Sequence, residues 1–379
     1  MTHRERLLNA MAHEQPDRVP IDLGGTINSS IVVEAYEPLK RHFGIESSNV
    51  PLNLMMRVVH VDERILRSLD IDVRNVTMWF PRGASGDSLN FFSYKDMWGV
   101  ERVRPEGGYY FDVIKPPLSG EIRVADVAKY TWPDPESVVE VNQIRKEIEL
   151  LRKTTDCAIV LYLPPPFVHT SQFLRGFEDW YVDFALNTKV LEALADATLE
   201  VNLAITGRVL KAVGNDVDVV LCADDLGAQC GLQVSPYDYR RYIKPRHAVY
   251  FQLIHELSPA RLLFHSCGSV ASIIEDFIEI GVDALNPVQV STSGMCPVSL
   301  KTQFGDRMVF WGAIDSQYVL PRGSVDDVRR AVEETVEQMG EGGGYVLSAV
   351  HNIQPDVPTE NILAMFQHAR EYVPSYVKG

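Results

Sequence analysis

From about residue 155 onward, short runs of apolar residues alternate with longer runs whose apolar positions recur every three or four residues. The short runs are apolar at nearly every position, which is typical of strands buried on both faces. Six such runs are present, at 158–163, 216–225, 261–266, 283–288, 308–314 and 345–350. The longer runs have helical periodicity and lie at 173–186, 190–213, 235–257, 269–281, 325–340 and 359–373.

Buried strands separated by helices indicate a parallel sheet with helices on both faces, because each parallel crossover needs a long connection. The first 150 residues supply two more strand candidates, at 18–24 and 73–78. Eight alternating β/α units favour closure into a barrel over an open sheet. We therefore predict an α/β protein with a (β/α)8 TIM-type barrel, in which residues 1–379 form a single domain.

One part of the N-terminal third departs from this alternation. The stretches FFSYKDMWGVERV, GYYFDVIKPPL and EIRV have short β-favouring runs, and Gly107-Gly108 marks a turn between the first two. Such runs joined by a tight turn are typical of antiparallel strands. We predict a small antiparallel β insertion over residues 85–125.

Composition and charge exclude several classes of partner. The chain has a formal net charge of −15, which argues against nucleic acid because phosphates would be repelled. No apolar run reaches the length of a membrane span, and the first twenty residues lack the apolar core of a signal peptide. The five cysteines are dispersed without CxxC spacing, so no disulfide framework is expected. We expect a soluble cytoplasmic protein.

The stretch RLLFHSCGSV ends a predicted strand with His265 and Cys267. Residues two apart in a strand share a face, so both side chains can point into the mouth of a barrel. Imidazole and thiolate together suit zinc. A third ligand must come from another strand, and His351 directly follows the last apolar run. The competing interpretation is that these are ordinary core or hydrogen-bonded residues.

Other predicted strands also end in polar residues, and in a barrel all these ends meet at one opening. An active-site cleft explains such a rim, although a helix cap or a turn would explain individual members. Cys230, after the DDLGAQ loop, is a minor candidate ligand. The polar positions are Asp224, Asp225, Asn286, Gln289, Asp315 and Asn352.

Four segments in this order resemble the uroporphyrinogen decarboxylase superfamily, and within it the cobalamin-dependent methyltransferase branch. The segments are RERLLNAMAHEQPDRVP, LFHSCGSVASIIEDFIEIGVDALNPVQ, FWGAIDSQYVLP and GGGYVLSAVHNIQPDVPTENI. The resemblance spans nearly the whole chain and implies a β/α barrel with its active site at the C-terminal mouth. True decarboxylases of this family carry a substrate loop of the MRQAGRY type, to which LMMRVVHVDERIL here matches only at Met56-Arg57.

The methyltransferases of this superfamily bind zinc through an HxC pair and a later cysteine. His265 and Cys267 match the pair, and His351 stands where the late cysteine would fall. The resemblance thus implies zinc held by His265, Cys267 and His351, together with a corrinoid (methylcobalamin or cob(I)alamin) carried by a partner protein. A homodimer is a further expectation.

Our hypothesis is a zinc-dependent corrinoid methyltransferase that moves methyl between a corrinoid protein and a small substrate, such as a methoxylated aromatic ether or a thiol. Asp224 or Asp225 would transfer a proton or orient a ligand. Two alternatives stay open: a metal-free decarboxylase that uses His351 and an aspartate, and a barrel that only binds a ligand. The side chains expected to contact substrate are Asn286, Gln289, Asp315 and Asn352.

Overall fold

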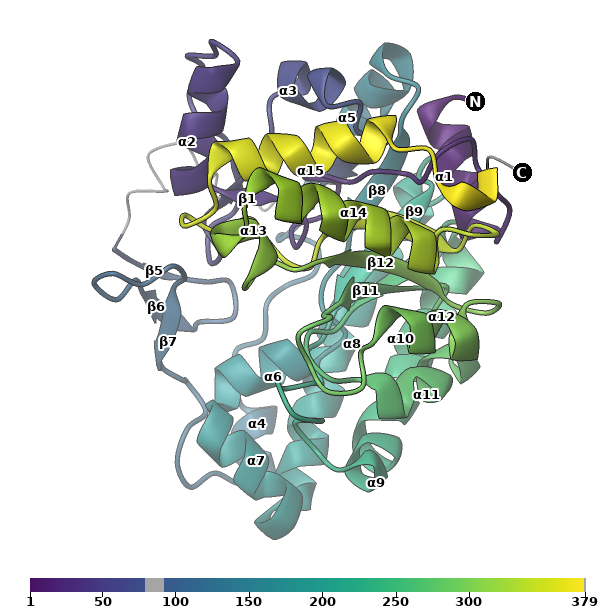
Figure 1. The fold of residues 1–379 in the computed structure, drawn as a ribbon. Coiled ribbons are helices and arrows are strands. Elements are labelled where there is room, and N and C mark those ends of the chain that lie inside the picture. Colours follow the sequence, from purple (N-terminus) through teal and green to yellow (C-terminus); the bar gives the residue numbers. More distant parts are fainter. Residues whose placement is uncertain (79–91, 378–379) are drawn as a thin grey trace.

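The computed structural model describes residues 1–78 and 92–377. Its centre is a parallel sheet of seven strands that curls around a core, with the neighbour order β13-β12-β11-β10-β9-β8-β4 (Figure 1). All seven coincide with apolar runs of the sequence and are almost entirely buried. The strands are β4 Val73–Val76, β8 Ala158–Tyr162, β9 Val219–Ala223, β10 Arg261–His265, β11 Ala284–Val288, β12 Val309–Ile314 and β13 Tyr345–Ala349.

The eighth place in the barrel is filled by the segment around Ile21. Ile21 forms a parallel bridge with Leu347 of β13, and its carbonyl accepts the amide N–H of Asp72 at 3.0 Å, just before β4. The predicted strand over 18–24 is therefore reduced to a single bridge, because Pro20 has no N–H to donate and the Asp22 side chain caps the N–H of Gly25. The TIM-type barrel is confirmed, with one shorter member than the sequence predicts.

Helices cover the outside of the barrel, and α14 and α15 lie side by side across one flank (Figure 1). The predicted helix over 173–186 is interrupted at Gly176, whose φ of 85° ends α6 and begins α7. A π-helical turn over Tyr239–Ile243 precedes α10.

The α-helices along the first half are α1 His3–Met11, α2 Val33–His42, α3 Glu63–Ser68, α4 Val124–Ala128, α5 Val141–Thr154, α6 Val168–Arg175, α7 Phe177–Leu186 and α8 Thr188–Val213. Those that follow are α9 Pro236–Asp238, α10 Lys244–Leu257, α11 Ile274–Glu279, α12 Pro297–Phe304, α13 Val319–Arg322, α14 Val325–Met339 and α15 Thr359–Glu371. None of the helices in residues 1–78 and 92–377 is both long and apolar enough to cross a membrane.

Two small antiparallel sheets accompany the barrel. The predicted insertion contains β5 Ser93–Lys95, β6 Glu101–Val103 and β7 Asp112–Lys115, and Gly107 and Gly108 lie in the turn between β6 and β7. Residues 85–91 of the predicted insertion lie outside the described residues. The prediction was wrong for EIRV at 121–124, because Val124 there begins α4. The second sheet, not predicted, has the order β1-β3-β2 and joins β1 Ile31–Val32, β3 Val58–Val59 and β2 Pro51–Asn53.

A buried ion-pair network holds the base of the barrel, at the N-terminal ends of the strands. The Asp72 carboxylate is fully buried and accepts hydrogen bonds from Arg6 at 2.6 Å, from Arg18 at 2.7 Å and from the N–H of Ile21 at 2.7 Å. One carboxylate thus ties α1, the bridging segment and the start of β4 together. Removal of one partner from a buried charge cluster leaves the other charges uncompensated.

We expect Asp72→Asn to lower the free energy of unfolding by about 3 kcal/mol, because two buried guanidinium groups lose their shared counter-charge. Chemical denaturation followed by circular dichroism measures this. The matched control is Asp326→Asn, which breaks a 3.1 Å pair with Arg329 on the exposed face of α14 and should cost at most about 0.5 kcal/mol. Equal losses in the two variants would contradict the importance of this closure.

Candidate metal centre

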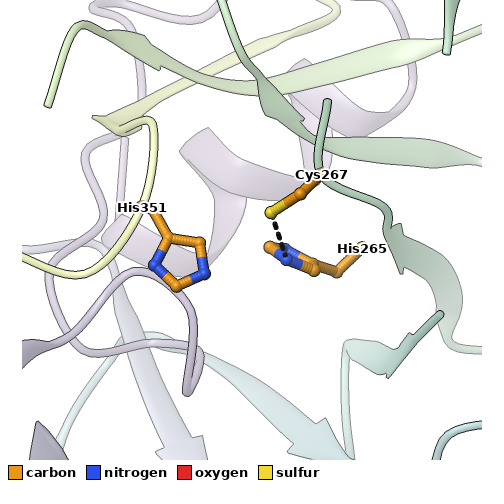
Figure 2. Close-up of side chains that lie close together, drawn as sticks. All are labelled: His265, Cys267 and His351. Atoms are coloured by element: carbon orange, nitrogen blue, oxygen red, sulfur yellow. Dashed lines mark hydrogen bonds between the residues drawn. The ribbon is translucent and has the colours of Figure 1, made fainter. Parts of the chain in front are cut away.

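Three side chains from two distant segments meet at the C-terminal mouth of the barrel. His265 is the last residue of β10, Cys267 lies two residues beyond it, and His351 lies two residues beyond the end of β13. Figure 2 shows all three pointing into one space, and their ligand atoms all lie within 4.8 Å of one another. The two imidazole ring centres are 5.5 Å apart, and the Cys267 sulfur lies 3.2 Å from Nε2 of His265.

The orientation of the His265 ring is fixed by Asn286, its register partner on β11. The Asn286 amide oxygen lies 2.5 Å from Nδ1 of His265, and its amide nitrogen donates to the carbonyl of Trp311 at 3.0 Å. Because the amide nitrogen of Asn286 donates to Trp311, its amide oxygen is the atom that faces Nδ1 of His265. An oxygen can only accept, so Nδ1 carries the proton and Nε2 presents a lone pair to the cluster. Asn286 is fully buried and holds the ring of His265, and its contact with substrate stays a prediction.

Burial sets the charge of the three side chains. It lowers the pKa of His265, and it lowers the pKa of His351 to about 4 with the neighbouring His265 ring adding to the effect. Burial, together with the charge of Asp225, raises the pKa of the Cys267 thiol well above its ordinary value. Both imidazoles are therefore neutral near pH 7 and offer lone pairs, which is the form in which histidine binds metals.

Asp225, directly after β9, links this cluster to a histidine that the sequence analysis missed. Its carboxylate accepts the N–H of Cys267 at 2.7 Å and lies 3.3 Å from Nε2 of His169. Burial disfavours the charged form of both groups, but the attraction between their charges is stronger. The Asp225 charge therefore raises the pKa of His169 to about 9, and His169 lowers the pKa of Asp225. The backbone N–H of Asp225 lies 3.2 Å from the same ring nitrogen. A histidine held by both the carboxylate and the backbone of Asp225 thus lies beside the neutral cluster. His169 escaped prediction because it lies in the first turn of α6, several residues beyond the end of β8.

Asp224 has a different environment from its neighbour. It is fully buried, and its carboxylate accepts the backbone N–H groups of Phe167, Val168 and His169 at 2.8–3.1 Å and lies 3.1 Å from Nε2 of His247. These contacts fix the first turn of α6 and therefore the position of His169. The sequence suggested proton transfer or orientation of a ligand for Asp224. Its acceptor sites are used within the chain, which is typical of an orienting residue, and proton transfer stays a prediction.

The other polar strand ends also bond within the chain. Gln289 accepts the N–H of Gly268 at 2.8 Å, directly after Cys267, and Asn352 accepts the N–H of Ser30 at 3.0 Å. Asp315 accepts two N–H groups of the turn before α13, both at 2.7 Å. These side chains hold the loops of the mouth in place, and a contact with substrate stays a prediction for them.

Two further residues at the mouth gave no signal in the sequence. Asn28, in the loop between the Ile21 bridge and β1, has its amide nitrogen 3.1 Å from Nε2 of His265. Tyr110, from the small insertion, accepts a hydrogen bond from Gln354 at 2.8 Å, and burial raises its pKa to about 12, with a smaller contribution from Cys267. The insertion therefore reaches the site. Cys230, the minor candidate, is exposed and is not among the three clustered ligands.

A second group of possible ligands, at the opposite end of the barrel, comprises His3, Asp156 and Cys157. Both ring nitrogens of His3 are already engaged, with Asp156 at 2.8 Å and with Asp70 at 2.9 Å. The Cys157 thiol is buried and donates to the carbonyl of Ile71. This group fits an ion-paired histidine at the base of the barrel better than a metal site.

Comparison with known proteins identifies the family to which this chain belongs. Residues 109–372 match the family model described as uroporphyrinogen decarboxylase (URO-D). The uroporphyrinogen decarboxylase of Methylococcus capsulatus is 23% identical over 73% of this chain and 75% of its own length, and one from Thermus thermophilus is 26% identical over 58% and 61%. Among solved structures, a methyltransferase from Methanosarcina mazei superposes with a TM-score of 0.68 at 20% identity, over 98% of this chain and 99% of its own. The chain belongs to the uroporphyrinogen decarboxylase (URO-D) family.

Proposed function

We propose that this protein is a zinc-dependent methyltransferase that moves a methyl group between a small substrate and the cobalt of a corrinoid protein. The observation that supports it most is the meeting of His265, Cys267 and His351 within 4.8 Å at the mouth of the barrel. Two imidazoles and one thiol are a ligand set that zinc prefers, and three protein ligands leave a position for substrate.

The surroundings of the three side chains suit a cation. Both imidazoles are neutral, and the half-buried thiol lies beside the carboxylate of Asp225. The amide oxygen of Asn28, close by, has no hydrogen-bond partner within the described part of the chain. Zinc bound by this set would act as a Lewis acid on an ether or hydroxyl oxygen, or would lower the pKa of a substrate thiol. A single thiolate ligand leaves more positive charge on the metal than two would, and this favours an oxygen substrate.

The His169–Asp225 pair would supply the proton that the proposed reaction needs. Transfer of a methyl group from an ether to the corrinoid of the partner would break the C–O bond and would leave the electron pair on the substrate oxygen. That oxygen then needs a proton. His169 carries one at neutral pH because Asp225 raises its pKa to about 9, so it is the acid that we assign to this step. Asp225 stays ionised and orients both His169 and the Cys267 backbone.

The structural neighbour from Methanosarcina mazei is named a methyltransferase, and its likeness to this chain is one of fold. It supports the proposal to the extent that the same barrel can carry methyl transfer. The corrinoid, carried by a separate protein, would supply the nucleophilic cobalt and would have to reach the open mouth of the barrel.

A metal-free decarboxylase is the second candidate, because the curated relatives are named uroporphyrinogen decarboxylase. In that reaction His351 and an aspartate would stabilise or protonate a carbanion. One structural observation weakens this candidate. Arg57, the residue that matches the arginine of the family's substrate loop, is 7% exposed and pairs with Glu34 at 2.6 Å. Its charge is thus already used within the chain, whereas a porphyrinogen with several carboxylates needs free cations.

The zinc content of variants tests the metal site. After equilibration with buffered zinc and removal of excess metal, we expect the wild type to hold about one zinc per chain and Cys267→Ala and His351→Ala to hold almost none. Elemental analysis measures this. The control is Cys296→Ala, which removes an exposed thiol in the loop before α12 and should leave the zinc content unchanged. A wild type that takes up no zinc would refute the proposed site.

Single-turnover methyl transfer tests the reaction. With a panel of methoxylated aromatics and cob(I)alamin, the zinc-loaded protein should form methylcobalamin and the demethylated product. His169→Gln should slow product formation about 100-fold, because general-acid assistance is lost. The control is His368→Gln in α15, where the histidine lies 2.8 Å from Glu333 of α14. This variant should leave the rate of product formation unchanged.

Two outcomes would contradict the proposed reaction. Decarboxylation of a carboxylated porphyrinogen by the metal-free protein would favour the lyase. Ligand or corrinoid binding without any demethylated product, over the whole panel, would favour a binding protein.

A further inference from the structure

Asn28 lies against the metal centre with only one end of its side-chain amide paired. Its side chain is 5% exposed, and its amide nitrogen lies 3.1 Å from Nε2 of His265, the lone pair that faces the cluster. Its amide oxygen has no hydrogen-bond partner among residues 1–78 and 92–377. A buried acceptor without a partner costs about 1–3 kcal/mol, so a fold that keeps it there calls for a compensating interaction.

Hydrogen bonds of its own loop hold Asn28 in place. The hydroxyl of Thr26 accepts the N–H groups of Asn28 and Ser29, and the N–H of Ser30 donates to Asn352.

The earlier part of the loop is held against β4. The side-chain amide of Asn75 donates to the carbonyl of Gly25 at 3.0 Å. A Cβ at Gly25 would lie 2.3 Å from a methyl group of Val73, so the backbone is pressed against β4. The fold therefore delivers the Asn28 amide to this position and holds it there.

A cation on His265 would change what the amide can do. The Nε2 lone pair cannot bind a cation and accept an N–H from Asn28 at the same time. A half-turn about the Cβ–Cγ bond exchanges the amide nitrogen and oxygen, and it would bring the oxygen that lacks a partner to the face of the cluster. The acceptor that lacks a partner in the chain would then have one in the cation.

We propose that Asn28 is the fourth side chain of this metal site and that its amide oxygen is a neutral ligand which the substrate displaces. The inference rests on the proposed function, since it requires zinc at His265, Cys267 and His351. A neutral amide oxygen competes weakly with thiolate and imidazole for zinc, so a substrate oxygen or sulfur can replace it. The displaced amide stays beside the incoming atom and can hydrogen-bond to it.

The affinity for zinc, measured by competition with a chromophoric chelator, distinguishes an oxygen ligand from a simple hydrogen-bond donor. We expect Asn28→Ala to weaken zinc binding about 10-fold. We expect Asn28→Asp to strengthen it about 10-fold, because a carboxylate is a better ligand and cannot donate to His265. The same variant should shift the visible absorption bands of the cobalt(II)-substituted protein, which report on the atoms bound to the metal.

The matched control is Asn75→Ala, which removes another buried asparagine that supports the same loop through Gly25. It should change the zinc affinity less than about 3-fold if the Asn28 oxygen, and not the loop as a whole, matters. Circular dichroism of each variant verifies that it is folded. Asn28→Asp binding that is weaker than or equal to the wild type, with an unchanged cobalt spectrum, would overturn the inference and leave the three-ligand site intact. A wild type without zinc would overturn the proposed function as well.

Discussion

The hydrogen bonds on either side of Ile21 close the parallel sheet between β13 and β4. Once the sheet is closed, the carboxyl ends of all its strands face one opening, and side chains that follow β10 and β13 can meet although they lie far apart in the sequence. The same N-terminal segment runs on from the closure, and its Ser30 pairs with Ile353 and Asn352 beside the last strand. Closure and the supply of Asn28 to the mouth are thus consequences of one chain path.

The two ends of the barrel use polar groups in opposite ways. At the base, Asp72 joins Arg6 and Arg18 in a fully paired, buried cluster whose charges compensate one another. At the mouth, His265, Cys267 and His351 are kept uncharged by burial, and the amide oxygen of Asn28 has no partner in the described chain. Buried charges that are all paired stabilise the fold. Uncharged side chains with free lone pairs, gathered beside an oxygen without a hydrogen-bond partner, are typical of a site that binds a ligand.

Around the three clustered side chains, a layer of polar groups sets their orientation. Asn286 fixes the ring of His265, Asp225 holds the backbone of Cys267, and Gln289 holds the next residue of the same turn. Asp224 acts one step further out, since it fixes the helix turn that carries His169. Such outer groups set the tautomer and direction of metal-binding side chains. The polar residues at the strand ends thus support the mouth of the barrel, and their contacts with substrate stay predictions.

The alternation of strands and helices, the barrel, the small insertion and the shared direction of His265 and Cys267 could be predicted from the sequence, because periodicity of burial and the two-residue repeat of a strand are local properties. His351 was indicated as well, through its place after the last apolar run. No sequence pattern showed that Asn286 turns to His265, that Asp224 and Asp225 have different partners, or that His169, Tyr110 and Asn28 reach the mouth. Those contacts join residues far apart in the chain, and each depends on which loop packs over the rim. The spacing of residues along a sequence carries no record of such packing.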